Sequence, residues 1–294
     1  MSAEALHDRA ARGEVADLPY RVIWRALSQR PGAHRSRHAG PGGKFRDVVP
    51  FLAAPDPRRI DLRLSLRDPW GALYVRRFEQ MASLDVVLLA DVSGSMGFCG
   101  QSRKMAMIAE LAEVLARSAR RVGDRFGLAA CDNLVREELG IVLSRARGGE
   151  GEMADRIARF VPRAAGAKGL QDAAFLLGGR QRLVVLVSDF RLPEADIVAL
   201  LDVLAAHDVV PIVLDDSAEV EALPSWGLIS LQDLETKRTR SILMRPALKA
   251  RVIAEDRARR AVLKRLFAQS AREAVFICDR IDWHHLGAAL VGSR

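Results

Sequence analysis

Apolar positions recur with two different patterns along the chain, and the change between them falls near residue 80. Upstream, apolar residues within 20–27 follow the i, i+3, i+4, i+7 spacing of an amphipathic helix. The alternation over Ile60–Leu66 and the run Leu73–Phe78 predict two short strands, and the Gly-, His- and Arg-rich stretch 31–47 predicts a loop. We therefore expect an N-terminal extension over residues 1–80 that carries a helix and a short β segment.

Downstream, continuous apolar runs alternate with helical patterns. Val86–Ala90, Leu183–Val187 and Val209–Leu214 predict strands that are buried on both faces of a parallel sheet. Further strands are predicted at 126–131 and 136–143 as an antiparallel edge pair, at 228–231 and 239–243 as a hairpin, and at 274–278. Helices are predicted near 103–122, 152–161, 170–177, 194–207 and 246–270, and from Trp283 onwards. This alternation predicts an α/β fold over residues 81–294, a three-layer, mostly parallel sheet with helices on both faces.

The composition is that of a globular protein, and it also bears on the cellular compartment that we expect. The 294 residues are 49% hydrophobic, and no apolar run approaches the ~20 residues that a membrane span requires. The first residues lack the apolar core of a secretory signal, and the three cysteines are scattered rather than paired. We therefore expect a cytoplasmic protein with no membrane span.

Positive charge is concentrated in the predicted extension. The whole chain has a formal net charge of +8, of which residues 1–80 carry +6, and residues 21–46 hold seven basic side chains and no acid. Such a run suits an acidic protein face, an anionic membrane or nucleic acid. Nucleic-acid binding through residues 21–46 and the basic helix 246–270 is thus an alternative to protein docking.

The candidate chemistry lies where two of the buried strands end. Asp91 opens the sequence Asp-Val-Ser-Gly-Ser, which places Ser93 and Ser95 on one short loop, and Asp189 closes the strand Leu183–Val187. In sheets of this type, functional sites form at the carboxyl ends of central strands. Carboxylate and hydroxyl oxygens are the ligands that Mg²⁺ prefers, so these four residues are candidate metal ligands.

This pattern resembles the metal-ion-dependent adhesion site of von Willebrand factor A domains. The segments Asp56-Pro-Arg-Arg-Ile-Asp61, Leu66-Arg-Asp-Pro69 and Leu73-Tyr-Val-Arg-Arg-Phe-Glu79 further resemble the bacterial family called domain of unknown function 58. The resemblance extends over about residues 35–290, and His34-Arg-Ser-Arg-His38 is similar to the MxaS-type proteins of methanol-oxidation operons.

The resemblance implies a site in which Asp91, Ser93, Ser95 and Asp189 surround Mg²⁺ with a threonine from a second loop. That threonine is missing, because no Ser or Thr lies between Ser144 and Ser188, and Lys168 stands at its position. We therefore expect Lys168 to neutralise the carboxylates and Mg²⁺ to bind weakly or not at all. Gln171 or Asp172 on the same loop offers a rival ligand.

For function, the resemblance implies a non-enzymatic module that docks on an acidic partner residue. Members of this family are often encoded beside MoxR-type AAA ATPases, which implies such an ATPase and a client protein as partners, with a role as a chaperone in enzyme maturation. For an MxaS-like protein the client would be a methanol dehydrogenase system. Arg35 and Arg37 are candidate partner contacts. A metal-dependent hydrolase is a third hypothesis, which the missing general base and nucleophile disfavour.

Overall fold

The structure is a computed structural model that describes residues 18–22, 24, 32–40, 44–164, 166–232 and 239–292. These residues fall into two compact units. The sheet unit contains the described residues of 1–21, 85–121 and 125–294, and the hairpin unit contains those of 22–84 and 122–124. Half of the helix expected over 20–27 falls outside the described residues, and residues 20–22 and 24 are not helical.

The sheet unit is built on a six-stranded sheet with the strand order β11-β8-β7-β4-β5-β6. Five strands are parallel, and β6 runs antiparallel to β5. The strands are β4 (Asp85–Asp91), β5 (Arg125–Cys131), β6 (Ile141–Ser144), β7 (Leu183–Ser188), β8 (Asp208–Asp215) and β11 (Val275–Cys278). The predicted α/β fold with a mostly parallel sheet is confirmed, including the antiparallel edge pair.

Burial explains why the two apolar runs lie in the middle of this sheet. Every residue of β4 and of β7 is buried, as expected for strands that are covered by helices on both faces. The chain leaves β4 for β5 on one side and later returns as β7 on the other side. The carboxyl end of β4 is therefore a topological switch point, where helices diverge and leave room for a site.

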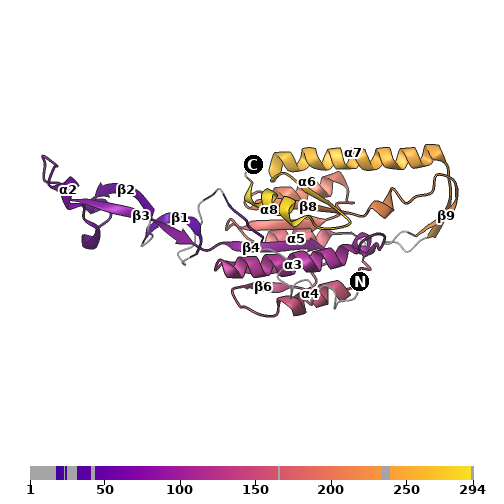
Figure 1. The fold of residues 1–294 in the computed structure, drawn as a ribbon, viewed down its shortest axis with the longest axis horizontal. Helices are drawn as coiled ribbons and strands as arrows, with labels where there is room; N and C mark the ends of the chain where they lie inside the picture. Colours follow the sequence, from indigo (N-terminus) through magenta and orange to yellow (C-terminus); the bar gives the residue numbers. More distant parts are fainter. Residues whose placement is uncertain are drawn as a thin grey trace. The chain divides into compact units, whose positions relative to one another are not determined.

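Helices form the outer two layers (Figure 1). Residues of α5, α6 and α7 share one apolar cluster with Leu89, Leu186 and Val213 of the sheet. The long helix α3 packs against β4, β5 and α4, and Figure 1 shows it in front of the sheet, with α5 and α6 fainter behind. The helices are α3 (Lys104–Arg121), α4 (Glu150–Arg159), α5 (Lys168–Leu176), α6 (Glu194–Val203), α7 (Pro246–Ser270) and α8 (Trp283–Val291). The predicted hairpin before α7 is confirmed as β9 (Gly227–Gln232) and β10 (Thr239–Met244).

The hairpin unit is a three-stranded antiparallel sheet with the order β1-β3-β2. Its strands are β1 (His34–Gly40), β2 (Lys44–Pro50) and β3 (Tyr74–Ala82). The loop expected over 31–47 was therefore wrong for most of its length. β1 and β2 pair with the two edges of the central strand β3, each with a shift in register. The Gly- and Arg-rich sequence forms strands because this pairing with β3 supplies its backbone hydrogen bonds.

The strand expected over Ile60–Leu66 was also wrong. Residues Leu62–Ser65 form the short helix α2, because the Asp61 carboxylate accepts a hydrogen bond from the Leu64 N–H at 3.1 Å. The Asp56 carboxylate caps the preceding 3₁₀ turn Pro57–Arg59 in the same way. Local side-chain to backbone hydrogen bonds thus outweigh the alternating pattern.

Among the described residues, none of the helices combines the length and the apolar character that crossing a bilayer demands.

Candidate functional site

The carboxyl end of β4 carries the first part of the site. Asp91 is fully buried and lies opposite Cys131 of β5. Its Oδ1 accepts a hydrogen bond from the Ser93 N–H at 2.9 Å, which folds the chain into a tight turn. The hydroxyl oxygens of Ser93 and Ser95 lie 3.2 Å apart, so both serines of the motif face the same space.

The carboxyl end of β7 adds the second part. Because Ala90 pairs with Val187, Ser188 lies beside Asp91 on the neighbouring strand. The Ser188 Oγ donates to Asp91 Oδ2 at 2.5 Å and accepts from the Phe190 N–H at 2.8 Å. We call Asp91, Ser93, Ser95, Ser188 and Asp189 the strand-end site.

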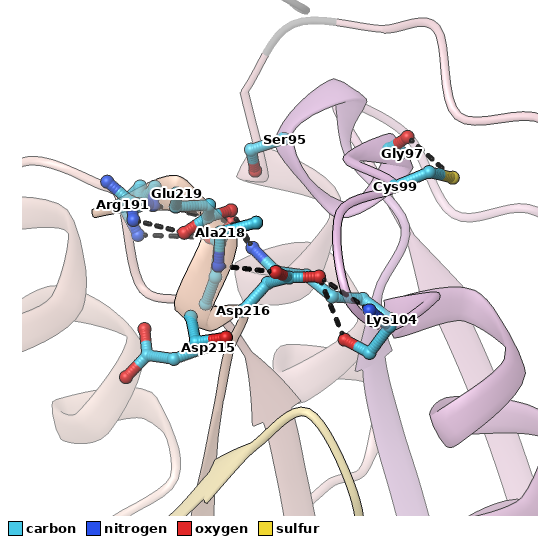
Figure 2. Close-up of polar contacts among 12 residues, drawn as sticks. Ser95, Gly97, Cys99, Lys104, Arg191, Asp215, Asp216, Ala218 and Glu219 are labelled. Atoms are coloured by element: carbon cyan, nitrogen blue, oxygen red, sulfur yellow. Dashed lines mark hydrogen bonds and ion pairs between the residues drawn. The ribbon is translucent and has the colours of Figure 1, made fainter. Parts of the chain in front are cut away.

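A buried lysine neutralises this site. Lys104, the first residue of α3, has no exposed side-chain surface, and its Nζ lies 3.2 Å from Asp189 Oδ2. The same Nζ donates to Glu219 Oε1 at 2.6 Å (Figure 2). One ammonium group therefore joins the end of β7 to the turn that follows β8.

Arg191 closes the network on its outer side. Its guanidinium pairs with Glu219 through Oε2 (Figure 2). The backbone N–H of Arg191 donates to Asp189 Oδ1 at 3.2 Å. Two cations, Lys104 and Arg191, thus balance the carboxylates of Asp189 and Glu219. Asp91 has no such cationic partner among the contacts of the described residues.

The protonation of Asp91 reflects that difference. Burial, followed by the negative charge of Asp189, raises the pKa of Asp91 to about 7, although hydrogen bonds from Ser188 and Ser93 act in the opposite direction. A carboxyl group in this position is therefore close to half protonated near neutral pH. Taken together with Lys104, Arg191 and Glu219, the strand-end site therefore carries little net charge.

A third buried carboxylate, Asp216, holds the loop between the motif and α3. Asp216, labelled in Figure 2, lies near Lys104. Its Oδ2 accepts from the Ser102 N–H at 2.9 Å, and its Oδ1 accepts from the Gln101 N–H at 3.1 Å. These contacts fix the start of α3 and with it the position of Lys104. The adjacent Asp215 forms an ion pair with Arg259 of α7 at 2.6 Å. The two aspartates at the carboxyl end of β8 therefore hold the start of α3 and the middle of α7.

The structure brings together some of the predicted site residues and separates others. Asp91, Ser93, Ser95 and Asp189 lie together as described above. Lys168 and Asp172 are exposed on α5, and Lys168 lines a pocket of about 340 Å³ together with Arg191. The cation against Asp189 is thus Lys104, where the sequence had suggested Lys168. Gln171 lines the same pocket and donates to the Asp196 carbonyl oxygen at 3.1 Å.

The remaining predicted contacts lie elsewhere. Arg35 and Arg37 are on β1 of the hairpin unit, and their side chains lie outside the described part. Arginines of the basic helix α7 mostly pair with nearby carboxylates: Arg251 with Glu255, Arg259 and Arg260 with Asp215 and Asp256, and Arg265 with Glu194. These pairs reduce the positive charge that the helix presents.

Lys104 was not identified as a site residue from the sequence, although its position on the buried face of α3 indicated one. The buried face of α3 includes Ile108, Leu111 and Leu115, and Lys104 continues this face one turn toward the N-terminus. A lysine at a core position, directly after the motif loop, needs a buried carboxylate partner. The two strand-end aspartates offered that partner.

Comparison with known proteins places this geometry in a family. Residues 50–262 match the family described as "Protein of unknown function DUF58". A Paracoccus denitrificans protein named "Uncharacterized protein in moxR 3'region" is 40% identical over 87 residues, which are 30% of this chain and 83% of that protein. An uncharacterized protein of Mycobacterium tuberculosis is 28% identical over 239 residues, covering 77% of this chain and 73% of the relative.

Solved structures with related folds are more distant. The conserved hypothetical protein BatB from Bacteroides thetaiotaomicron has a TM-score of 0.43 at 12% identity, covering 71% of this chain and 97% of its own. Proximal thread matrix protein 1 from the mussel byssus, solved with a zinc-occupied MIDAS motif, has a TM-score of 0.32 at 19% identity, covering 45% of this chain and 38% of its own.

Proposed function

From the premise that the chain belongs to the DUF58 family, we propose that it is a non-enzymatic protein-interaction module. Its strand-end site is a degenerate metal-ion-dependent adhesion site that receives an acidic residue of a partner protein. The observation that carries this proposal is Lys104, whose buried ammonium pairs with Asp189 of the site and with Glu219 beside it.

The residues present do not fit a tightly held Mg²⁺ ion. Both oxygens of Asp189 already accept hydrogen bonds, one of them from Lys104, and an ammonium group beside a bound metal would repel it. No Ser or Thr lies between Ser144 and Ser188 to complete the oxygen set from the second loop. Lys104 takes the electrostatic place of the ion.

The surface beside the site suits an acidic partner. Lys168 and Arg191 line the neighbouring pocket, and Ser95 of the strand-end site is partly exposed. Arg191 already pairs with Glu219, so Lys168 is the lining cation with no carboxylate partner among the described residues, beside one lining carboxylate, Asp196. A carboxylate of the partner would accept a hydrogen bond from Ser95 and a charge-assisted bond from Lys168.

A MoxR-type AAA ATPase is the partner that the family relationship favours. The Paracoccus relative is named for its place in the moxR 3' region, and this gene neighbourhood supports a shared task. In this proposal the ATPase remodels a client enzyme during maturation in the cytoplasm, and the present chain supplies recognition as a chaperone component. A methanol dehydrogenase system of the kind served by MxaS-type proteins is the proposed client.

Affinity capture tests the docking role. The wild-type chain should retain the MoxR-type ATPase of the same genome, and Asp91→Ala should release it. Because Asp91 is buried and its loss could disturb the fold, Ser95→Ala, at a partly exposed position, provides a second variant. Asp202→Ala on the exposed face of α6 is the matched control and should retain the ATPase.

Two outcomes would contradict the proposal. One is equal retention of the ATPase by wild type, Asp91→Ala and Ser95→Ala. The other is salt-sensitive retention of nucleic acid by all variants in place of the ATPase, which would favour the alternative function of the basic segments.

A further inference from the structure

The loop between β2 and β3 exposes apolar side chains that the function proposed above does not use. This loop, residues 51–73, closes one end of the three-stranded sheet, and we call it the tip. Its two ends are joined by a hydrogen bond from the Phe51 N–H to the Leu73 carbonyl oxygen at 2.7 Å. In Figure 1 the tip appears as the α2 end of the hairpin unit.

Large apolar side chains of the tip are almost completely exposed. The exposed fractions are 93% for Leu52, 85% for Leu66 and 88% for Trp70. Leu62 is 67% exposed and begins α2, and Leu66, four residues later, is the C-cap of this short helix, so the two side chains lie on the same side of the turn. Single exposed leucines are ordinary, but a concentration of this kind within one loop marks a binding surface.

The tip is built to hold these side chains outward. Asp68 Oδ2 accepts from the N–H groups of Trp70 and Ala72 at 3.2 and 2.8 Å. The buried Ser65 Oγ accepts from the Tyr74 N–H at 2.9 Å, which ties α2 to the start of β3. The exposed leucines therefore belong to an ordered loop with its own hydrogen bonds.

The acidic side chains of the tip are paired and several of its arginines are not, which favours binding to an anionic surface. Its three acids are engaged internally: Asp56 with Arg59, Asp61 with Arg76, and Asp68 with backbone N–H groups. Arg58, Arg63 and Arg67 are exposed and have no carboxylate partner among the described residues. The acids are thus paired within the hairpin unit, and three guanidinium groups remain available beside the apolar side chains.

We propose that the tip inserts peripherally into an anionic lipid surface, with Leu62, Leu66 and Trp70 at the headgroup boundary and Arg58, Arg63 and Arg67 on the lipid phosphates. Segments that lie in the membrane interface typically combine leucine and tryptophan with nearby arginine. Side chains exposed by 85–93% stand out from the surface, and a lipid interface accepts such protrusions without a matching groove. A protein partner would have to offer an acidic groove of the same shape.

Vesicle binding by the full chain tests this. We expect the protein to sediment with phosphatidylcholine vesicles that contain phosphatidylglycerol but not with phosphatidylcholine alone. Binding should weaken as salt rises from about 0.1 to about 1 M, because the screening length falls from about 10 to about 3 Å. Tryptophan emission should shift to shorter wavelength on binding, and Trp70→Phe should lose most of that shift.

Two variants separate the apolar and the charged contributions. Leu66→Ser combined with Trp70→Ala should abolish sedimentation, and changing Arg58, Arg63 and Arg67 to Gln should weaken it about fivefold per arginine. The matched control is Trp226→Ala combined with Leu228→Ser, which removes exposed apolar side chains of the sheet unit and should bind as wild type. All variants should keep the wild-type unfolding midpoint.

The proposal is overturned if the wild type sediments with neither vesicle, or if tip and control variants bind equally. A third result would also overturn it: the wild type binds no vesicles but binds a purified acidic protein, and the tip variant does not bind that protein. The tip would then be a protein-docking surface.

Discussion

The carboxyl end of the main sheet and the tip of the hairpin unit distribute polarity in opposite ways. At the sheet end, charged groups such as Lys104, Asp91 and Asp189 are buried. At the tip, Leu66 and Trp70 are exposed. A buried charge is stable only with its partner, whereas an exposed apolar side chain contributes little to the fold. The first region should therefore respond strongly to single substitutions, and the second should respond only in binding.

The largest expected effect is at Lys104. Lys104→Met leaves Asp189 and Glu219 with only Arg191, and removing one partner of a buried pair costs about 3–5 kcal/mol. Denaturant unfolding measures this loss. Lys168→Met is the matched control, because this exposed lysine should change the free energy of unfolding by less than about 0.5 kcal/mol. Equal losses for the two lysines would contradict the role given to Lys104.

An intermediate effect is expected at Asp91, and it depends on pH. Burial and the neighbouring Asp189 raise the pKa of Asp91 from 3.8 to about 7. The folded protein thus holds this proton more tightly than the unfolded chain does, so this group lowers the free energy of unfolding as the pH rises from about 4 to about 7. Asp91→Asn should remove that dependence and be the more stable protein above pH 7, by at most roughly 4 kcal/mol.

Unfolding midpoints measured across this pH range check the prediction, with Asp202→Asn as a control for an exposed carboxylate. Parallel pH profiles for Asp91→Asn and the wild type would show that Asp91 titrates at its ordinary pKa.

The smallest effect is expected at the tip. Trp70→Ala should change the free energy of unfolding by less than about 0.5 kcal/mol, because 88% of this side chain is exposed. Phe190→Ala is the comparison within the sheet unit. Phe190 is 1% exposed and packs edge-to-face on Phe267 with ring centroids 4.9 Å apart, so its loss should cost about 3–5 kcal/mol. A large loss at Trp70 would mean that its indole packs within the fold.

The sequence predicted the sheet unit well because long apolar runs such as Leu183–Val187 have only one way to be buried. It failed in the hairpin unit, where Asp61 caps a helix within an alternating pattern and where β1 and β2 depend on pairing with β3. Local capping and long-range pairing leave no periodic signal.

Within the site, the motif aspartates and serines were predicted because they follow apolar strands. Lys104 and Glu219 come from two other segments, and only the fold places their side chains 2.6 Å apart. The sequence could therefore indicate that a cation was needed but not which lysine supplies it.

Calorimetric titration of Mg²⁺ into the wild type and into Lys104→Met tests the central claim most directly. If Lys104 takes the place of the ion, the wild type should show no binding in the micromolar range. Lys104→Met, which frees Asp189 and Glu219, should bind Mg²⁺ more tightly than the wild type does. Micromolar binding by the wild type, unchanged in Lys104→Met, would contradict the account.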